Sequence, residues 1–206
     1  MFSEVLDCGT KTLADSTHHR LIAVALRARP GRLDASVSSV TRRSGESLDA
    51  ALARAVDIGA LAYVEQLETR ILRDGSLATA YLGLVHADAD ERPLGDRPAT
   101  ADERELVAAA QARLRAKLSY TNVGFALAPA TFTISELREV YVAALGHDVS
   151  ATNLQRVLLR RGVLERVGDR RPPGRSGGRP AALFRFASQR LEVTDEFAAL
   201  RPPTSR

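Results

Sequence analysis

The sequence predicts two domains: an α/β (α+β) domain over most of the chain, and a smaller C-terminal domain in which two helices precede a β-hairpin. Three observations support this prediction. Short apolar segments with strand-like alternation dominate the first half, capped helical segments dominate the second, and the charge is divided unevenly. The segment Ser150–Arg190 holds ten arginines and two acids, a net charge of +8, whereas the remainder of the chain sums to −4. A basic segment attached to an acidic body is typical of a protein that binds a polyanion.

The composition excludes several classes of protein. Hydrophobic residues make up 45% of the 206 residues, which indicates a packed core rather than disorder. Residues 1–17 lack the basic-then-apolar pattern of a signal peptide, and no apolar run approaches the ~20 residues that span a bilayer. The single cysteine, Cys8, cannot form an internal disulfide. We therefore expect a cytoplasmic protein with no membrane partner.

Four segments of the first half have the length and pattern of β-strands. Residues 1–19 lack periodicity and are predicted to be a tail. Leu21–Leu26 is a short apolar run, and Leu33–Val40 alternates apolar with polar residues after a turn at Pro30-Gly31. Tyr63–Ile71 and Ala78–Val85 flank a second turn. These pairs predict antiparallel hairpins.

Two helices complete the predicted first domain. Ser47–Ile58 has one apolar face behind a serine N-cap. Thr100–Leu118 begins with a capping box formed by Thr100 and Glu103 and carries a continuous apolar stripe. The charged segment before it, rich in proline and glycine, is predicted to be a loop.

The C-terminal elements follow the order of a winged helix-turn-helix. Phe132–Leu145 is helical, with a capping box at Thr133 and Glu136 and a terminating Gly146. A second helix, Ala151–Arg161, follows after a short turn. Val163–Val167 and Ala182–Phe186 are then predicted to be the two strands beside a wing rich in arginine, proline and glycine.

The second of these helices carries the residues expected to touch DNA. With Leu154, Val157 and Leu158 turned inward, the opposite face presents polar side chains that can read base edges in the major groove. The wing adds cations suited to a phosphate ridge or a minor groove. The predicted DNA-binding residues are Thr152, Asn153, Arg156 and Arg160 on the helix and Arg170, Arg171, Arg175 and Arg179 in the wing.

A fragment of a catalytic motif lies in the first domain. In the Nudix hydrolase box, several carboxylates on a loop and helix hold Mg²⁺ against a diphosphate. Glu46 and Arg54 stand at the right spacing, but Ala55, Ile58 and Gly59 occupy positions where the box has glutamates. One carboxylate cannot build that cluster. We therefore predict no catalytic residue, no metal and no resident cofactor.

With these features, the chain resembles the Nudix-related transcriptional regulators. The resemblance runs over about Leu21–Phe186 and is stronger in the C-terminal half. Its most specific stretches are Tyr63–Leu67, Ala80–Val85, Lys117–Asn122, Phe132–Tyr141 and Gly178–Phe186. It implies a degenerate Nudix-like sensor and dimerisation domain over residues 20–126, a winged helix over 127–190 and a C-terminal tail over 191–206.

The resemblance also implies a function and partners. Members of this family bind palindromic operators as homodimers. Many repress NAD biosynthesis or salvage genes and respond to ADP-ribose or related nucleotides, and others control sugar catabolism. The expected function is thus a dimeric DNA-binding regulator of NAD-related or other metabolic genes, with an inactive Nudix-like domain and ADP-ribose as a candidate effector.

Alternatives to this function stay open at the level of sequence. One is a Nudix-type nucleotide-diphosphate hydrolase, against which the missing carboxylates argue. Another is an adaptor that uses the winged helix to dock proteins, against which the net charge of +8 argues. Within the sensor domain, a phosphate-bearing ligand can bind without metal through Arg42, Arg43, Arg70 and Arg73, or the pocket is lost and the domain serves for dimerisation.

Overall fold

The fold was obtained as a computed structural model, which describes residues 19–87, 89, 95–171 and 181–195, with the side chains of 169–171 left out. The predicted N-terminal tail falls outside these residues, apart from His19, which opens the first strand. Within the described part, no helix is long and apolar enough to cross a membrane.

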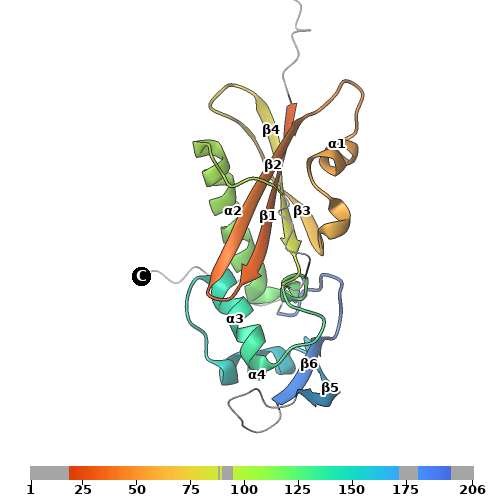
Figure 1. Cartoon of the computed structure of the whole chain (residues 1–206), viewed down its shortest axis with the longest axis vertical. Coiled ribbons are helices and arrows are strands. Elements are labelled where there is room, and N and C mark those ends of the chain that lie inside the picture. Colours follow the sequence, from red (N-terminus) through yellow and green to blue (C-terminus); the bar gives the residue numbers. More distant parts are fainter. Residues whose placement is uncertain (1–18, 88, 90–94, 172–180, 196–206) are drawn as a thin grey trace, which may run out of the picture.

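The first domain is built on a four-stranded sheet (Figure 1). Its strands are β1 (His19–Arg29), β2 (Arg32–Thr41), β3 (Tyr63–Ile71) and β4 (Leu77–Val85), in the order β2-β1-β4-β3. The two predicted antiparallel hairpins, β1-β2 and β3-β4, are confirmed. They join through a parallel pairing of β1 with β4, which the sequence pattern did not predict.

Helices cover both faces of this sheet. Alternate residues of β1 point to opposite sides: Leu21 packs beneath α1 (Leu48–Ala55), and Ile22 packs beneath α2 (Ala101–Tyr120). Figure 1 shows the two helices on either side of the strands. Because both sides of β1 are buried, it reads in sequence as a continuous apolar run rather than an alternating one.

The first helix is shorter than predicted. It ends at Ala55, because Val56 takes an extended conformation and is buried. Asp57 then caps a separate 3-10 turn, η1 (Ile58–Ala60), by accepting a hydrogen bond from the amide of Gly59. The expectation of one continuous helix to residue 58 is therefore wrong.

The second domain contains a helix-turn-helix and a hairpin. Its elements are the 3-10 helix η2 (Val123–Ala126), α3 (Ile134–Leu145), α4 (Ala151–Arg160), β5 (Leu164–Arg171) and β6 (Ala181–Phe186). The predicted capping box at the start of α3 is present, and Gly146 ends this helix in the left-handed conformation that glycine adopts readily. The hairpin pairs β5 with β6 antiparallel.

One residue before α3 completes the winged-helix sheet. Phe132 forms an isolated bridge with Phe184 of β6, and its ring meets that of Phe186 with 5.4 Å between centroids. Phe132 is fully buried. Phe132 thereby fixes the hairpin to the start of α3. The elements follow the winged-helix order that the sequence predicted.

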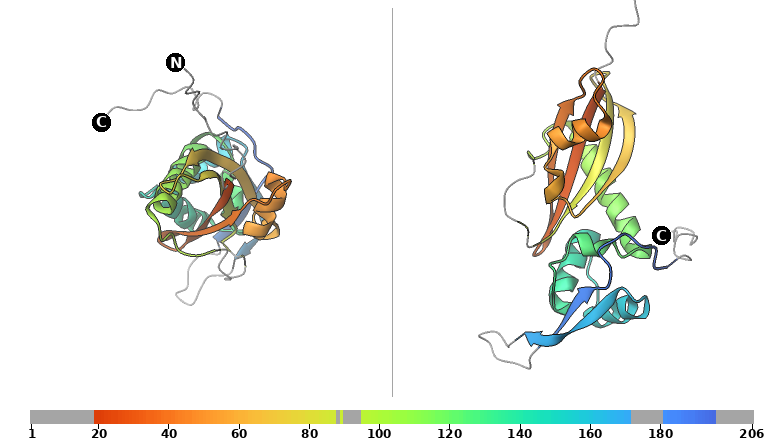
Figure 2. Two further views of the ribbon diagram at one scale, coloured as in Figure 1. Left: turned by 90° about the horizontal axis from the view of Figure 1, so that it is seen from above. Right: turned by 90° about the vertical axis from the view of Figure 1, so that its right-hand side faces the viewer.

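Direct contacts hold the two domains together, one below the other in Figure 2. The tip of the first domain packs against α3 through β1 and β2. His86, just beyond β4, lies with its Nδ1 2.9 Å from the carbonyl oxygen of Ala128, and the amide of Ala87 donates to Leu127. A single cluster of buried apolar side chains runs through both domains.

The segment 188–195 also joins the domains. It lies against the end of α2, where buried Asn122 donates its side-chain amide to the carbonyl of Arg190 and accepts from the amide of Glu192, each at 2.8 Å. The amides of Thr194 and Asp195 both donate to the carbonyl of Tyr120. Part of the region predicted as a tail from residue 191 is therefore structured. The domain boundaries themselves stay a prediction.

Candidate nucleic-acid interface

The helix α4 forms an exposed polar surface because only one of its faces is apolar. Ser150 caps it by accepting a hydrogen bond from the amide of Asn153, and Leu154 and Leu158 bury the inner face. The four predicted contact residues of the helix, Thr152, Asn153, Arg156 and Arg160, are all exposed on the outer face. The ten residues of α4 include no acid, so this surface favours an anionic partner.

Two of these side chains are hydrogen-bonded to each other. A guanidinium nitrogen of Arg156 donates to the side-chain oxygen of Asn153 at 2.8 Å. No ion pair between Arg156 and an acid is found among the described residues. Because the partner of Arg156 is a neutral amide, this contact brings no negative charge to offset the guanidinium.

Other arginines of the domain are neutralised by acids. Arg161, at the end of α4, pairs with Asp195 at 2.7 Å, and Arg185 of β6 pairs with Glu165 at 2.9 Å. Arg138 of α3 reaches Asp148 at 2.5 Å and also donates to the carbonyl of Val149. Of the ten arginines counted in Ser150–Arg190, Arg161 and Arg185 are therefore paired with acids.

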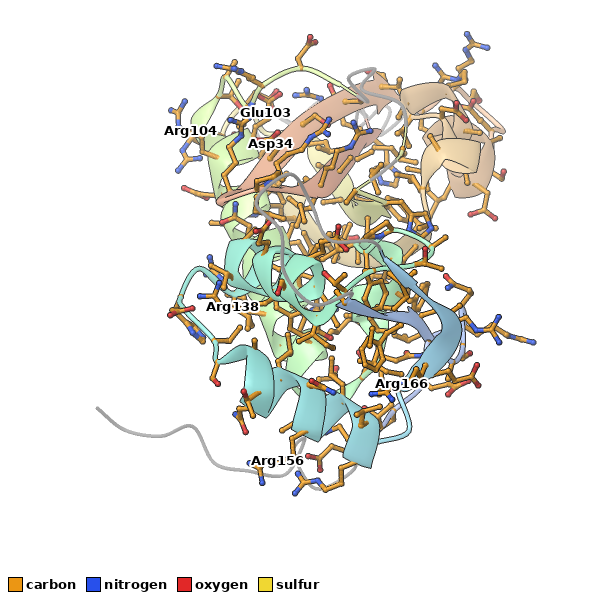
Figure 3. The ribbon with its side chains drawn as sticks, turned by 60° about the horizontal axis from the view of Figure 1, so that its bottom comes forward. Asp34, Glu103, Arg104, Arg138, Arg156 and Arg166 are labelled. Carbon is orange, nitrogen blue, oxygen red and sulfur yellow. The ribbon has the colours of Figure 1, made fainter. Side chains whose placement is uncertain are left out.

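Arg166 of β5 is an exposed cation that the sequence analysis did not single out. It pairs across the hairpin with Phe184, and its guanidinium lies over that ring, 5.7 Å from the centroid. Figure 3 shows Arg156 on α4 and Arg166 on β5. The signal in the sequence was its place on the strand predicted at Val163–Val167, which in the structure contacts α4.

The wing is described only at its base. Arg170 and Arg171 lie on β5, opposite Ala182 and Ala181 of β6, and their side chains are not described. Arg175 and Arg179 fall outside the described residues. DNA contacts by these four arginines therefore stay a prediction.

The remaining carboxylate of the Nudix-like box is bound by the protein itself. Arg54 grips Glu46 with two hydrogen bonds of 2.8 and 2.9 Å, and the amide of Arg43 donates to the same carboxylate at 2.8 Å. These bonds, Arg54 first, lower the pKa of Glu46 to about 2. Arg54 also donates to the carbonyl of Thr41. The pair therefore ties the end of β2 to α1.

The four arginines suggested for phosphate binding do not form one cluster. Arg42 lies beside α1 and donates to the carbonyl of Glu46. Arg70 and Arg73 instead turn to α2 on the other side of the sheet, where both reach Glu105 and Arg73 also pairs with Asp102. Arg42 and the pair Arg70 and Arg73 therefore lie on different sides of the sheet, and Arg70 and Arg73 are already paired with carboxylates. Phosphate binding by these arginines stays a prediction. Within the described residues, no group of three or more potential metal ligands occurs.

The fold defines a class of protein in which a Nudix-like α/β domain is joined to a winged helix. Residues 124–186 match the family described as the NrtR DNA-binding winged helix domain. The winged helix is thus similar to that of NrtR, and the two-domain fold is the one that the resemblance implied.

Individual relatives agree with this assignment. The chain is 36% identical over 88 residues to the ADPR responsive transcriptional repressor NtrR of Acinetobacter baylyi, a match over 43% of this chain and 34% of that protein. It therefore spans about a third of the length of this curated relative.

Two solved structures share the fold. The NrtR of Shewanella oneidensis, solved in complex with a 27mer DNA, superposes with a TM-score of 0.61 at 23% identity, over 82% of this chain and 93% of that one. A MutT/nudix family protein from Enterococcus faecalis superposes with a TM-score of 0.60 at 14% identity, over 85% and 90%. At these identities the likeness establishes the fold alone.

Proposed function

We propose that this protein is a DNA-binding transcriptional regulator, a repressor of NAD-related or other metabolic genes, whose Nudix-like domain is catalytically inactive. The observation that carries the proposal is the outer face of α4. It presents Asn153, Arg156 and Arg160 to solvent, free of acids, on a winged helix whose sequence matches a DNA-binding family. A helix of this kind places its exposed residues in the major groove, where arginine and asparagine read base edges.

The inactive Nudix-like domain is supported by the bonds of Glu46. A metal-holding carboxylate must offer free lone pairs, and here three of those of Glu46 already accept hydrogen bonds from Arg54 and from the amide of Arg43. The residues at the other box positions, Ala55, Ile58 and Gly59, cannot replace it. We propose a regulatory role for this domain, with ADP-ribose as the first effector to test, because a relative carries the name of an ADPR responsive repressor.

A dimer on a palindromic operator forms part of the proposal. One recognition helix contacts few base pairs, and selecting one site in a genome needs more. Two copies on a two-fold site supply them, with half-sites about one helical turn apart or a multiple of it. Sedimentation of the free protein at micromolar concentration tests this directly. A monomer there, with no dimer on DNA either, contradicts it.

The test of DNA binding uses matched arginine variants. Sequences bound by the protein are first selected from random DNA, and affinity is then measured by fluorescence anisotropy at several salt concentrations. We expect Arg160→Ala, which removes an exposed cation of α4, to weaken binding and to reduce the slope against salt by about 0.9. The control is Arg104→Ala, which removes one exposed cation from the start of α2, well away from α4 in Figure 3. Equal effects of the two variants, or no selected sequence, contradict the proposal.

A further inference from the structure

The hydrogen bond between Arg156 and Asn153 changes what this helix can read. An asparagine recognises adenine with both ends of its amide: the oxygen accepts from the N6 amino group, and the nitrogen donates to N7. A guanidinium has donors only, so the atom of Asn153 that faces Arg156 at 2.8 Å must be the oxygen. The end needed for the adenine amino group is therefore already engaged by a cation.

We propose that Asn153 and Arg156 act as one recognition unit that presents chiefly hydrogen-bond donors and selects guanine. This inference rests on the proposed DNA-binding function and specifies its readout. The unit presents the amide hydrogens of Asn153 together with the unused guanidinium hydrogens of Arg156. Guanine has two matching acceptors, N7 and O6, on its major-groove edge.

Adenine is disfavoured by the same geometry. Its N6 amino group would have to share the oxygen of Asn153 with the guanidinium, and the two donors, one of them a full cation, would repel each other. Asn153 lies in the first turn of α4, the part of a recognition helix that usually reaches base edges. Its backbone amide is already held by Ser150, which fixes the start of the helix.

The local charges keep this pair together. Three acids of this part of the chain are paired with other arginines: Asp148 with Arg138, Glu165 with Arg185 and Asp195 with Arg161. Among the described residues, Asn153 is thus the polar side chain that holds Arg156. They are three positions apart along the helix, which places both side chains on the same face.

The inference predicts a change of base preference rather than a simple loss. The wild-type protein and three variants, Arg156→Ala, Asn153→Ala and the double variant, are each used to select sequences from random duplex DNA. We expect the wild type to select guanine, with adenine at that position about ten- to a hundredfold weaker. Arg156→Ala frees the oxygen of Asn153, so this variant should prefer adenine at the same position of the selected sequence. The double variant should lose the preference for adenine.

The outcomes separate this inference from the function on which it rests. Asn153→Ala should keep a reduced guanine preference, because Arg156 still carries donors. A wild type that selects adenine, and loses it in Asn153→Ala, overturns the coupled unit while leaving DNA binding intact. If Arg156→Ala does not acquire a preference for adenine, the coupled unit is also overturned. A wild type that selects no sequence overturns the proposed function itself. Circular dichroism of each variant verifies the fold, which substitutions at two exposed positions should preserve.

Discussion

The ion pair between Arg161 and Asp195 is predicted to hold the recognition helix to the rest of the protein. Arg161 lies directly after α4, and Asp195 belongs to the segment that is hydrogen-bonded to the end of α2. The two side chains meet at 2.7 Å, and only 15% and 17% of their surfaces are exposed. Because water is largely excluded, the pair is stronger than a surface ion pair, and removing Asp195 takes from Arg161 the carboxylate that it binds.

The magnitude follows from the distance and the burial. Two charges 4 Å apart attract by about 1 kcal/mol in water and about 4 kcal/mol at the effective dielectric constant of a protein surface. A hydrogen bond to a charged group contributes about 1.5–3 kcal/mol. We therefore expect Asp195→Ala to lower the free energy of unfolding by about 2–3 kcal/mol, with Asp195→Asn less harmful because its amide still accepts.

A double-mutant cycle measures the pair itself. Arg161→Ala, Asp195→Ala and the double variant are unfolded in urea, and their coupling should be about 2 kcal/mol. The matched control is Arg32 with Asp34, which also meet at 2.7 Å but are 71% and 43% exposed, so that solvent screens them and their coupling should be close to zero. A coupling between Arg161 and Asp195 no larger than that of the control refutes the reasoning.

Two further predictions concern the packing and the box. Gly124→Ala should lower the free energy of unfolding by about 1–3 kcal/mol, since the added Cβ would lie 2.7 Å from the hydroxyl of Tyr141, whereas Gly168→Ala, with open space around it, should be nearly neutral in the same urea titration. Because Arg54 lowers the pKa of Glu46 to about 2, below its ordinary 4.5, their bond should stabilise the fold above pH 4.5 and lose this effect as pH falls toward 2. The stability difference between wild type and Glu46→Gln should shrink over that range, and a difference independent of pH would contradict this.

Local features of the fold could be predicted from the sequence. The capping boxes of α2 and α3 depend on residues three apart, Thr100 with Glu103 and Thr133 with Glu136, and both are present. The hairpin β3-β4 likewise depends on a short turn between strands that adjoin in sequence. Such features require no knowledge of distant contacts.

Features that depend on distant contacts could not be predicted. The parallel pairing of β1 with β4 joins segments about 58 residues apart, and no local pattern specifies it. The neutralisation of Arg161 depends on Asp195, in a region predicted as a tail. The position of Arg166 over the ring of Phe184 follows from their pairing across the hairpin and not from its own sequence neighbourhood. The exposed polar face of α4 could thus be predicted from the sequence. Which arginines are not paired with acids could be seen only in the structure.

The most direct test of the account is the specificity ratio for DNA. The affinity of the protein for its selected sequence is compared with that for a shuffled sequence of the same composition, at one physiological salt concentration. A sequence-reading regulator should prefer its site by roughly a thousandfold or more. We expect a ratio of that order for the wild type and a smaller ratio for Arg156→Ala. A ratio near one in the wild type contradicts it, since the basic surface would then bind DNA through phosphates alone.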